Sequence, residues 1–547
     1  MRPFISKYKY YLLLVLIFII AEVFVNPTGN FPLNDDWTYG KSVLLLQQEG
    51  KLNIGNFAAM SLFTHIVWGF LFAKTFWFSF TILRISTLVS ALVGVFVLNK
   101  LVFKITQNKT TAFVASLTLL FNPLYFNLSN TFMTDVNFNT LLLLGVYFAY
   151  DFFHTKERSS FMLVFVMSTL LVLVRQFGII LPVCFAVACL TLVEKRGFIF
   201  GLALLFTALV YGIFKYYEHY LKGVLPPGAS YKFSGNVDPG KTQFWNVFFV
   251  NWNLRYKQIL LHILVYAFPF TIVFLKDLVR SVKNVSVVIV FGGAFYLTYC
   301  LFEKEKFPHG NVFTNMSLGA ETFYEALSSE IKADKAHTFS KSFESCMVVV
   351  KFVFSGLTLV TLLLGIVHGI KSKVNLLKLH PTVIFLSLVF CAYIFLILIT
   401  ESYFDRYHIP LIAMAIVIFS FLNRRSGAYN ILAIIPLICL FYVSVFGTKD
   451  YLQLNRTRWQ AYDYLKQQKN IPVDNINGGF EVNCWNDGKY TWWSDFLTVE
   501  SFDYLIQYRK ETGFTLYKRF GFQKYFPYKK DTVNIFVKEN ITQAESN

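Results

Sequence analysis

Long apolar runs constrain this chain more than any other feature of its sequence. They recur along roughly the first four-fifths of its 547 residues, and each holds ~20 residues, the length that crosses ~30 Å of hydrocarbon as an α-helix. A helix satisfies its own backbone hydrogen bonds in lipid, whereas an open sheet does not. Because 55% of the residues are hydrophobic and the mean hydropathy is +0.50, the sequence predicts an all-α polytopic membrane protein.

The basic residues lie mainly in short loops between the apolar runs. The formal net charge is +18, but charge in such loops orients helices, so no nucleic-acid partner is expected. Of the 7 cysteines only Cys484 lies in the polar tail, and the others lie in apolar runs. The sequence therefore predicts neither a disulfide framework nor a cysteine-based zinc site.

The amino terminus sets the expected orientation. Arg2, Lys7 and Lys9 precede the apolar segment Tyr11–Val25, which no small-residue cleavage site follows. We expect this segment to remain as the first helix, with its amino terminus in the cytoplasm. The segment Phe57–Phe76 is apolar enough to span, but a span there would place the later basic loops outside. We therefore expect it to lie on the outer surface.

With that choice, the cytoplasmic connections between the later helices are all basic, as the positive-inside rule requires. About thirteen transmembrane helices are expected, with boundaries that are approximate. After the first, they cover about residues 80–100, 111–128, 136–153, 159–174, 176–193, 197–217, 258–276, 284–302, 344–370, 380–400, 407–422 and 428–446.

The chain changes character after residue 447. Residues 448–547 are polar and aromatic, with a helical stretch at Trp459–Lys469 and a strand-like stretch at Thr532–Lys538. We therefore expect two domains. Residues 1–447 form the transmembrane domain, and residues 448–547 form a small external α/β domain.

One motif is a decoy. Gly235–Thr242 reads GNVDPGKT, which matches the Walker A pattern letter for letter. A phosphate-binding loop of that type needs a buried strand before it and a helix whose amino terminus faces the phosphates, and a polar external loop supplies neither. We expect no nucleotide site there.

Polar and charged residues gather at the expected external ends of several helices. Each alone has a plain explanation, because acids beside a membrane are often solvated, arginines reach the headgroups, and histidines sit at the interface. Together on one face they predict a cavity with a carboxylate base and cationic groups able to hold a phosphate. The residues are Asp35, Asp36, His65, Arg84, Asp135, Arg175, Gln176, Glu401, Asp405 and Arg406.

Such a set of groups suits the transfer of a sugar from a lipid-linked phosphate. The transition state is oxocarbenium-like, the acceptor must lose a proton to a base, and the departing phosphate needs stabilisation. Of the adjacent acids, Asp35 is the better candidate base. Tyr39 falls on its helical face four residues later, whereas Asp36 points ~100° away.

Five stretches of the sequence resemble the membrane-embedded GT-C glycosyltransferases. The similar groups are the dolichyl-phosphate-mannose protein mannosyltransferases and the bacterial aminoarabinose transferases that modify lipid A. The stretches match, in order, the family's first external loop, the start of its second helix, its second acidic loop, its basic-Gly-to-Pro stretch and its late Arg-Tyr-x-x-Pro motif. They are NDDWTYGKSVLLLQQEGKL from Asn34, LRISTLV from Leu83, FMTDVNF from Phe132, VRQFGIILP from Val174 and DRYHIP from Asp405.

This resemblance implies an inverting transfer from a polyprenyl-phosphate sugar. In the first loop, Asp35 takes the place of the family's catalytic Asp, Asp36 that of the following Glu, and Tyr39 that of the Tyr. The expected site residues are Asp35, Asp36 and Asp135 for catalysis, Arg175, Arg406 and Arg84 for the donor phosphate, and Tyr39, His65, Gln176 and Tyr407 for substrate binding.

The expected partners are the lipid-linked sugar donor, membrane lipids and an acceptor that is a glycan, a lipid or a protein. No cofactor is certain, and a divalent cation, Mg²⁺ or Mn²⁺, held by the three carboxylates stays open. The expected location is the bacterial inner membrane, with the active site and the carboxyl-terminal domain facing outside. The aminoarabinose transferases carry Lys-Pro in the first loop where this chain has Ala59-Met60-Ser61-Leu62, which argues against the aminoarabinose activity itself.

The alternative reading is a transporter or flippase of lipid-linked saccharides, which also uses intramembrane arginines and acids. Such a protein is expected to show inverted repeats with broken helices near the midplane of the membrane. The sequence shows no such internal symmetry.

Overall fold

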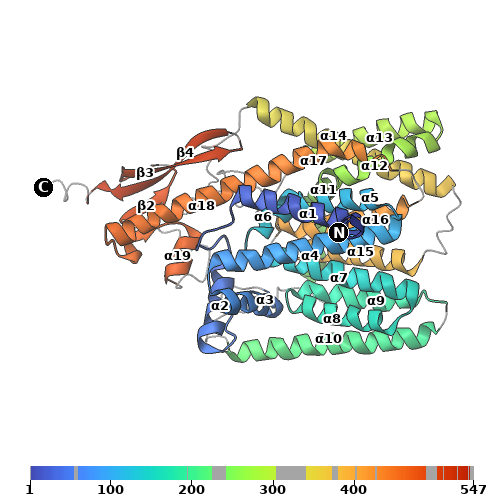
Figure 1. The fold of residues 1–547 in the computed structure, drawn as a ribbon, viewed down its shortest axis with the longest axis horizontal. Helices are drawn as coiled ribbons and strands as arrows, with labels where there is room; N and C mark the ends of the chain where they lie inside the picture. The colour runs from blue at the N-terminus through green and yellow to red at the C-terminus, as the bar shows by residue number, and fades with distance from the viewer. Residues whose placement is uncertain are drawn as a thin grey trace.

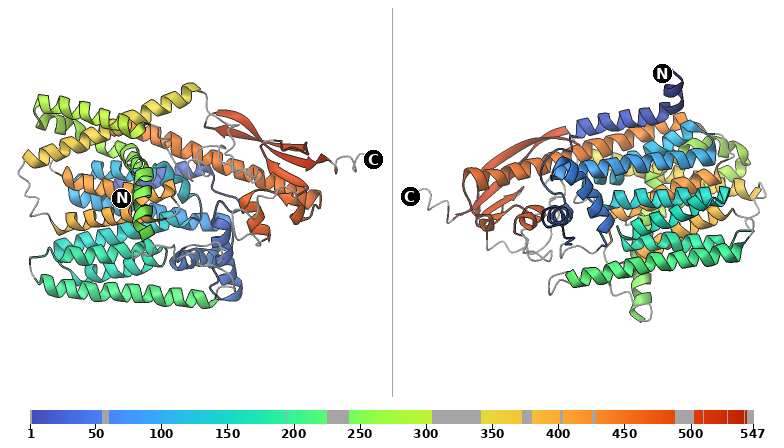
Figure 2. Two further views of the ribbon diagram at one scale, coloured as in Figure 1. Left: turned by 180° about the vertical axis from the view of Figure 1, so that it is seen from behind. Right: turned by 60° about the horizontal axis from the view of Figure 1, so that its bottom comes forward.

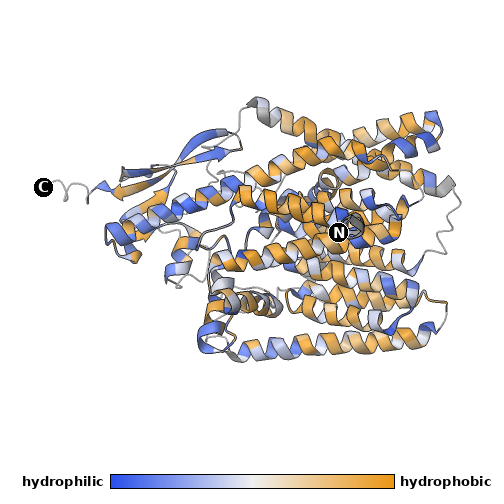
Figure 3. Cartoon of the chain, in the orientation of Figure 1, coloured by the Kyte–Doolittle hydropathy of each residue, from blue (hydrophilic) through white to orange (hydrophobic). Residues whose placement is uncertain are grey.

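The fold is a bundle of long helices with a small sheet domain at one end (Figure 1). The computed structural model describes residues 2–54, 60–193, 195–224, 242–303, 341–371, 380–400, 403–424, 428–487, 502–508, 510–526, 528–539 and 541. Apolar residues cover the bundle, and polar residues are concentrated in the sheet domain and at the ends of the helices (Figure 3).

The long helices of the membrane part run roughly along the long axis of the molecule (Figures 1 and 2). The membrane part contains both long and short helices. They are α1 (Arg2–Val25), α2 (Asp36–Glu49), α3 (Phe63–Phe76), α4 (Phe80–Thr106), α5 (Lys109–Leu120), α6 (Pro123–Ser129), α7 (Thr134–Thr155), α8 (Arg158–Val172), α9 (Ile180–Cys189), α10 (Arg196–Val224), α11 (Thr242–Tyr266), α12 (Phe268–Ser281), α13 (Asn284–Phe302), α14 (Lys341–Lys371), α15 (Pro381–Ile399), α16 (Ile409–Leu422) and α17 (Ile434–Phe441).

Within the described residues, 9 helices are long and apolar enough to cross a membrane, or up to 11 if each of two bent pairs counts as one span. Two shorter apolar helices, Arg158–Val172 and Gln176–Cys189, complete the set. Every segment in the sequence-based set of about thirteen overlaps one of these helices or bent pairs, and the prediction of an all-α polytopic membrane fold with a small α/β domain is confirmed.

The two bends lie where prolines begin new helices. The pair α5 and α6 bends by 67°, with Pro123 in the first turn of α6, and the pair α11 and α12 bends by 72°, with Pro269 in the first turn of α12. Proline lacks the N–H that would continue the preceding helix. The helices expected over residues 111–128 and 258–276 therefore each cross a break, which lies at Ala267 in the second.

The short helices α2 and α3 lie at the end of the bundle nearest the sheet domain (Figure 1). Neither is among the helices able to span, and α3 has 14 residues, which makes it ~21 Å long, too short for the hydrocarbon layer. Of the segment expected on the surface, residues 57–59 lie outside the described residues. Gly40 lets α2 approach α4, because a Cβ there would lie 2.6 Å from the Phe80 ring.

Basic connections gather at the opposite end of the bundle. Lys104 pairs with Asp151, His154 stacks on His380, and Arg280 donates to the Tyr429 hydroxyl. This separation of charged ends is the one from which the sequence predicts the orientation. The Walker-like residues 235–241 and Glu401 lie outside the described residues.

The carboxyl-terminal domain is reached through an unbroken helical segment. After α17, one π-helical turn (Tyr442–Phe446) leads into α18 (Gly447–Asp463), and another (Tyr464–Gln468) ends it. The expected boundary at 447/448 thus falls at the start of α18. The domain also contains α19 (Phe480–Asp487) and a sheet of order β1-β2-β4-β3, formed by β1 (Ile476–Asn477), β2 (Tyr504–Gln507), β3 (Phe514–Tyr525) and β4 (Tyr528–Lys538).

In this sheet β1 and β2 are parallel, and the other pairs are antiparallel. The long hairpin β3–β4 packs against α18. Asp450 on α18 accepts the backbone N–H groups of Tyr525 and Phe526 at 2.7 and 2.6 Å. The strand expected at Thr532–Lys538 forms the second half of β4.

Candidate active site

The side chains of Asp35 and Asp36, adjacent in the first loop, point in different directions. Asp35 stands at the amino end of α2, and its Oδ2 lies 3.4 Å from Nη2 of Arg406, which follows Asp405 in the short helix Asp405–His408. Asp36 turns the other way, and its Oδ2 accepts the backbone N–H of Phe132 at 2.9 Å. Successive residues of a helix diverge by ~100°, so the two carboxylates cannot share one cavity.

A second ion pair lies beside the first. Nη2 of Arg175 is 2.8 Å from Oδ2 of Asp135, and Nε of Arg175 donates to the Thr134 hydroxyl at 2.8 Å. The four charged side chains are buried, with exposed fractions of 8% for Asp35, 3% for Arg406, 3% for Asp135 and 5% for Arg175. Ion pairs held this far from solvent are much less screened than surface pairs.

Tyrosines join the two pairs. Tyr39 is 2% exposed and lies close enough to all four charged groups for each to act on its ionisation. The Arg175 guanidinium lies 5.7 Å from the centre of the Tyr407 ring. We call these six residues the charged cluster: Asp35, Tyr39, Asp135, Arg175, Arg406 and Tyr407.

Arg406 is the cation of this cluster with hydrogen-bonding capacity to spare. Its backbone N–H donates to the Asp405 carboxylate, and its guanidinium lies 4.7 Å from the centre of the Phe404 ring. Its Nε and Nη1 are buried and have no hydrogen-bond partner among the described residues. Because buried donors are normally paired, these two atoms suit an anionic ligand.

The surroundings of Asp35 favour a proton acceptor. Burial raises the pKa of its carboxyl above 3.8, Arg406 opposes that rise, and the negative charges of Asp135 and Glu481 add to it. A carboxylate with a raised pKa holds a proton more readily than an ordinary aspartate. Burial also raises the pKa of Tyr39 well above 10.0, so this hydroxyl remains protonated.

Asp36 holds the second acidic loop in place. Besides the Phe132 N–H, it faces Arg84, and burial raises the pKa of its carboxyl to about 8. A protonated or hydrogen-bonded carboxyl in this place supports the loop that carries Asp135 three residues after Phe132. These are the contacts of a residue that positions the second acidic loop, and its catalytic role stays a prediction.

His65 has protein partners on both ring nitrogens. Nε2 bonds to the Phe132 carbonyl at 3.0 Å, and Nδ1 to the side-chain amide of Asn137 at 2.7 Å. Burial lowers the pKa of His65 to about 3, so the ring is neutral. With 0% exposure it offers no free edge to a substrate, and its contacts fix the loop at Phe132.

Arg84 also contacts backbone rather than the charged cluster. Its guanidinium donates to the carbonyls of Pro27, Gly29 and Phe31, and it lies 4.6 Å from the Phe31 ring centre. Three backbone contacts fix the first loop just before Asp35. Nη1 and Nη2 of Arg84 already have acceptors, and its Nε is buried without a partner among the described residues. Arg84 therefore has less capacity left for a donor phosphate than Arg406.

Gln176 begins the short helix Gln176–Ile179 directly after Arg175, and it is half-buried beside the cluster. Sequence reasoning had no signal for two further contacts on the first loop. The backbone N–H of Asn34 donates to Glu481 at 3.1 Å, and Glu481 pairs with Arg458 at 2.7 Å. The carboxyl-terminal domain therefore touches the loop one residue before Asp35.

Trp37 makes the other contact. It packs in the core of the carboxyl-terminal domain, edge-on to Phe480 at 6.1 Å between ring centres. The sequence places it between the two acids and Tyr39, which gives no hint of a partner outside the bundle. The other members of this small core are Phe480, Cys484, Phe502, Leu505, Phe514 and Phe536.

The carboxylates do not make a good metal site. Asp35 and Asp135 are each paired with an arginine, and Asp36 accepts a backbone N–H and faces away. Across the described part of the chain, no group of three or more His, Cys, Asp or Glu side chains is placed to hold a metal ion. A divalent cation would have to displace an arginine, so we derive no step through one.

No family model matches the sequence, and no curated protein matches it. Similar solved structures include two of ArnT from Cupriavidus metallidurans, an aminoarabinose transferase of the GT-C family. The apo structure has 11% identity, covers 88% of this chain and 84% of its own, and has a TM-score of 0.39. The structure bound to undecaprenyl phosphate has 10% identity, covers 91% and 86%, and has a TM-score of 0.38. Similarities this weak carry no conclusion on function, for which the charged cluster is the evidence.

Proposed function

We propose that this protein is an integral-membrane glycosyltransferase that moves a sugar from a polyprenyl-phosphate donor to an acceptor at the end of the bundle nearest the carboxyl-terminal domain. One observation carries the proposal. A buried carboxylate, Asp35, lies 3.4 Å from an arginine, Arg406, that has two unpaired donors among the described residues. The resemblance of the first loop to the GT-C family supports the class of donor.

In the proposed reaction Asp35 takes the proton of an acceptor hydroxyl. The acceptor oxygen attacks the anomeric carbon, and the bond from that carbon to the phosphate oxygen breaks. The electron pair leaves with the lipid phosphate, whose new charge is met by Nε and Nη1 of Arg406. One proton moves to Asp35 and no other reactant is required.

The second ion pair completes the site. Arg175 lies beside the ring of Tyr407, and Asp135 fixes its direction. The four charges of the cluster sum to zero, so an incoming phosphate is held by arginine donors turned toward it rather than by an excess of positive charge. Tyr39 and Tyr407 provide rings against which a sugar can lie.

The test is transfer by purified protein in liposomes, with labelled polyprenyl-phosphate sugars and a panel of acceptors. Asp35→Asn should lower single-turnover transfer by at least ~100-fold, the scale of a lost general base, while donor binding remains. Asp151→Asn is the matched control, because Asp151 pairs with Lys104 at the opposite end of the bundle.

Two results would contradict the proposal. Translocation of the labelled lipid without covalent transfer would identify a flippase. Full transfer by Asp35→Asn would remove the first loop from the chemistry.

A further inference from the structure

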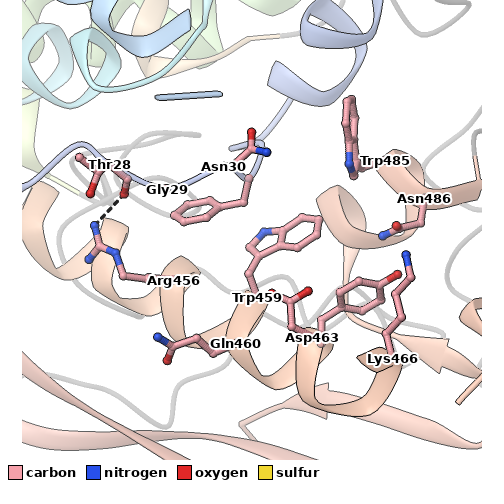
Figure 4. A pocket seen from close by; sticks show the side chains of 12 residues that line it. Thr28, Gly29, Asn30, Arg456, Trp459, Gln460, Asp463, Lys466, Trp485 and Asn486 are labelled. Carbon is pink, nitrogen blue, oxygen red and sulfur yellow. Dashed lines mark hydrogen bonds between the residues drawn. The ribbon is translucent and has the colours of Figure 1, made fainter. Parts of the chain in front are cut away.

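A cavity of about 420 Å³ lies outside the charged cluster, between the first loop, α18 and α19 (Figure 4). None of the six residues of the cluster lines it. We call it the loop cavity. Its wall combines Thr28 to Phe31 with residues of the carboxyl-terminal domain, which are Arg456, Trp459, Gln460, Tyr462, Asp463, Lys466, Trp485 and Asn486.

Aromatic rings make up much of this wall. Phe31 and Trp459 are stacked with 6.4 Å between ring centres, and Tyr462 meets Trp459 edge-on at 5.5 Å. Trp485 packs on Phe78 and Phe80 of the bundle and borders the cavity as well. Rigid rings of this kind give a small ligand a flat apolar surface at low conformational cost.

Polar groups complete the wall and include an unpaired donor. Trp459 is 8% exposed, and its Nε1 is buried without a hydrogen-bond partner in the part of the chain that the structure describes. Gln460 and Asp463 are exposed at the cavity, and Asn486 is half-buried (Figure 4). An amide, a carboxylate and an indole N–H are donors and acceptors suited to hydroxyl groups.

The charges of the wall do not suit a phosphate. Nη2 of Arg456 donates to the carbonyls of Asn26 and Thr28, and Nη1 donates to Gln453, so both terminal nitrogens already have acceptors. Lys466 and Asp463 carry opposite charges on the same helical face, three residues apart. The net charge of the wall is +1, from Arg456, Lys466 and Asp463, and Arg456 is held by backbone carbonyls. This arrangement favours an uncharged, hydroxyl-rich ligand over an anionic one.

The loop cavity is physically joined to the proposed catalytic residue. Gly29 and Phe31 line it, and Arg84 fixes the carbonyls of both residues. Gly29 has φ +140, and a Cβ there would lie 2.2 Å from the Phe31 ring, so this turn needs glycine. Phe31 precedes Asp35 by four residues, a span of at most ~14 Å of chain.

We propose that the loop cavity binds a neutral saccharide of the acceptor, which stacks on Trp459 and Trp485 and bonds through its hydroxyls to Gln460, Asp463 and Asn486. Its role as an acceptor subsite rests on the proposed transferase function. Saccharide binding itself does not depend on transfer, so the two can fail separately.

The first experiment measures binding without catalysis. Tryptophan fluorescence of the full-length protein in detergent is titrated with maltotriose, mannotriose and chitotriose, and Asp35→Asn is titrated in parallel. At least one trisaccharide should give a saturable change, equal in both proteins. Gln460→Ala and Asp463→Asn should each weaken it about three- to tenfold, the scale of one lost hydrogen bond.

Gln468→Ala is the matched control, because Gln468 is exposed near the carboxyl end of the same helical segment and does not line the cavity. It should bind like wild type. Absence of a saturable signal for all three sugars at millimolar concentrations, or equal affinity in Gln460→Ala, Asp463→Asn and wild type, would overturn the proposal.

The second experiment measures transfer. Gln460→Ala should raise the KM for a saccharide acceptor and leave the KM for the donor lipid and kcat near wild type. Binding without any transfer would contradict the proposed function and leave the saccharide site standing. Transfer with an unchanged acceptor KM in Gln460→Ala and Asp463→Asn would contradict the acceptor subsite and leave the transferase standing.

Discussion

Asp35 and Asp36 are neighbours in sequence, but their carboxylates meet partners 371 and 96 residues away, Arg406 and the Phe132 N–H. The helix that begins at Asp36 separates them, since adjacent side chains of a helix point in different directions. In the proposed reaction Asp35 accepts a proton, whereas Asp36 accepts the backbone N–H of Phe132.

Asp36→Asn should be mild for transfer, because the amide oxygen still accepts the Phe132 N–H. Its effect on stability should depend on pH. The folded-state pKa of Asp36 is raised from 3.8 to about 8, so its stabilising contribution is present at low pH and is lost as the pH rises toward 8. Thermal unfolding in detergent should show wild type losing stability relative to Asp36→Asn between about pH 5 and about pH 8. A difference in Tm that stays constant with pH would mean that Asp36 is already ionised at the lower pH.

Arg406→Ala should cost ~2–4 kcal/mol of transition-state stabilisation, the scale of losing a charge-assisted donor in a partly dry site. Arg406→Lys should recover only part of the loss, since lysine has the charge but not the planar fork. The measurement is kcat/KM for the donor lipid at saturating acceptor. Equal values in all three proteins would reduce Arg406 to a structural partner of Asp35.

The sequence predicted the location of the site residues better than their individual contacts. Apolar periodicity and the positive-inside rule placed Asp35 and Arg406 at the same end of the bundle, but their ion pair comes from the structure. The partners of Arg84, and one of the two partners of His65, are backbone carbonyls. Every residue has a carbonyl, so no pattern of residue types reveals these contacts. Glu481 was missed for a similar reason, because its acceptor role is to a backbone N–H of the first loop.

At the scale of elements, α2 is held from two sides. Gly40 packs on Phe80 of the bundle, and Trp37 packs in the core of the carboxyl-terminal domain. Hydrophobic periodicity predicted the long spans well, because each must be continuously apolar. It could not predict the burial of α2, which comes from packing on α3 and Phe80 and on a domain located more than 400 residues later.

The two bends of the bundle could have been predicted from prolines, although not from hydrophobic periodicity alone. Pro123 and Pro269 each stand in the first turn of a new helix, and a proline at that position marks a helix start. The apolar character continues across both breaks, so a search for ~20-residue runs joins the two helices of each pair.

Trp37→Ala should loosen α2 from the carboxyl-terminal domain. Truncation of a buried tryptophan costs ~3–5 kcal/mol, so the domain should become more sensitive to limited proteolysis and transfer should fall. Trp77→Ala is the control, since Trp77 is 83% exposed. Unchanged proteolysis and transfer in Trp37→Ala would show that this contact does not hold the loop.

On the scale of the whole molecule, several contacts restrict the motion of the carboxyl-terminal domain relative to the bundle. The helical segment from α17 through α18 enters it without a break, and Lys449 donates to the Phe24 carbonyl at the end of α1. Asp450 then fixes the β3–β4 hairpin to the same helix. The domain therefore holds a fixed position against the first loop, and Glu481 is the charged residue that contacts the loop.

Glu481→Gln tests whether the charge of this domain affects the ionisation of Asp35. The glutamine oxygen can still accept the Asn34 N–H, so the loop should keep its position, but the negative charge that raises the pKa of Asp35 is gone. The proposed base must be deprotonated to act, so kcat/KM rises with pH through the Asp35 pKa, and this ascending limb should move to lower pH in Glu481→Gln.

The matched control for that profile is Glu539→Gln, because Glu539 is in the same domain, 51% exposed, and pairs loosely with Lys510 at 3.8 Å. Its limb should coincide with that of wild type. A structural role for Glu481 alone would lower the rate at every pH and leave the limb in place, whereas a shift to lower pH with a preserved plateau requires its charge to reach Asp35. A shift to higher pH would contradict the assignment of Asp35 as the titrating base, because removal of a nearby negative charge can only favour the ionised carboxylate.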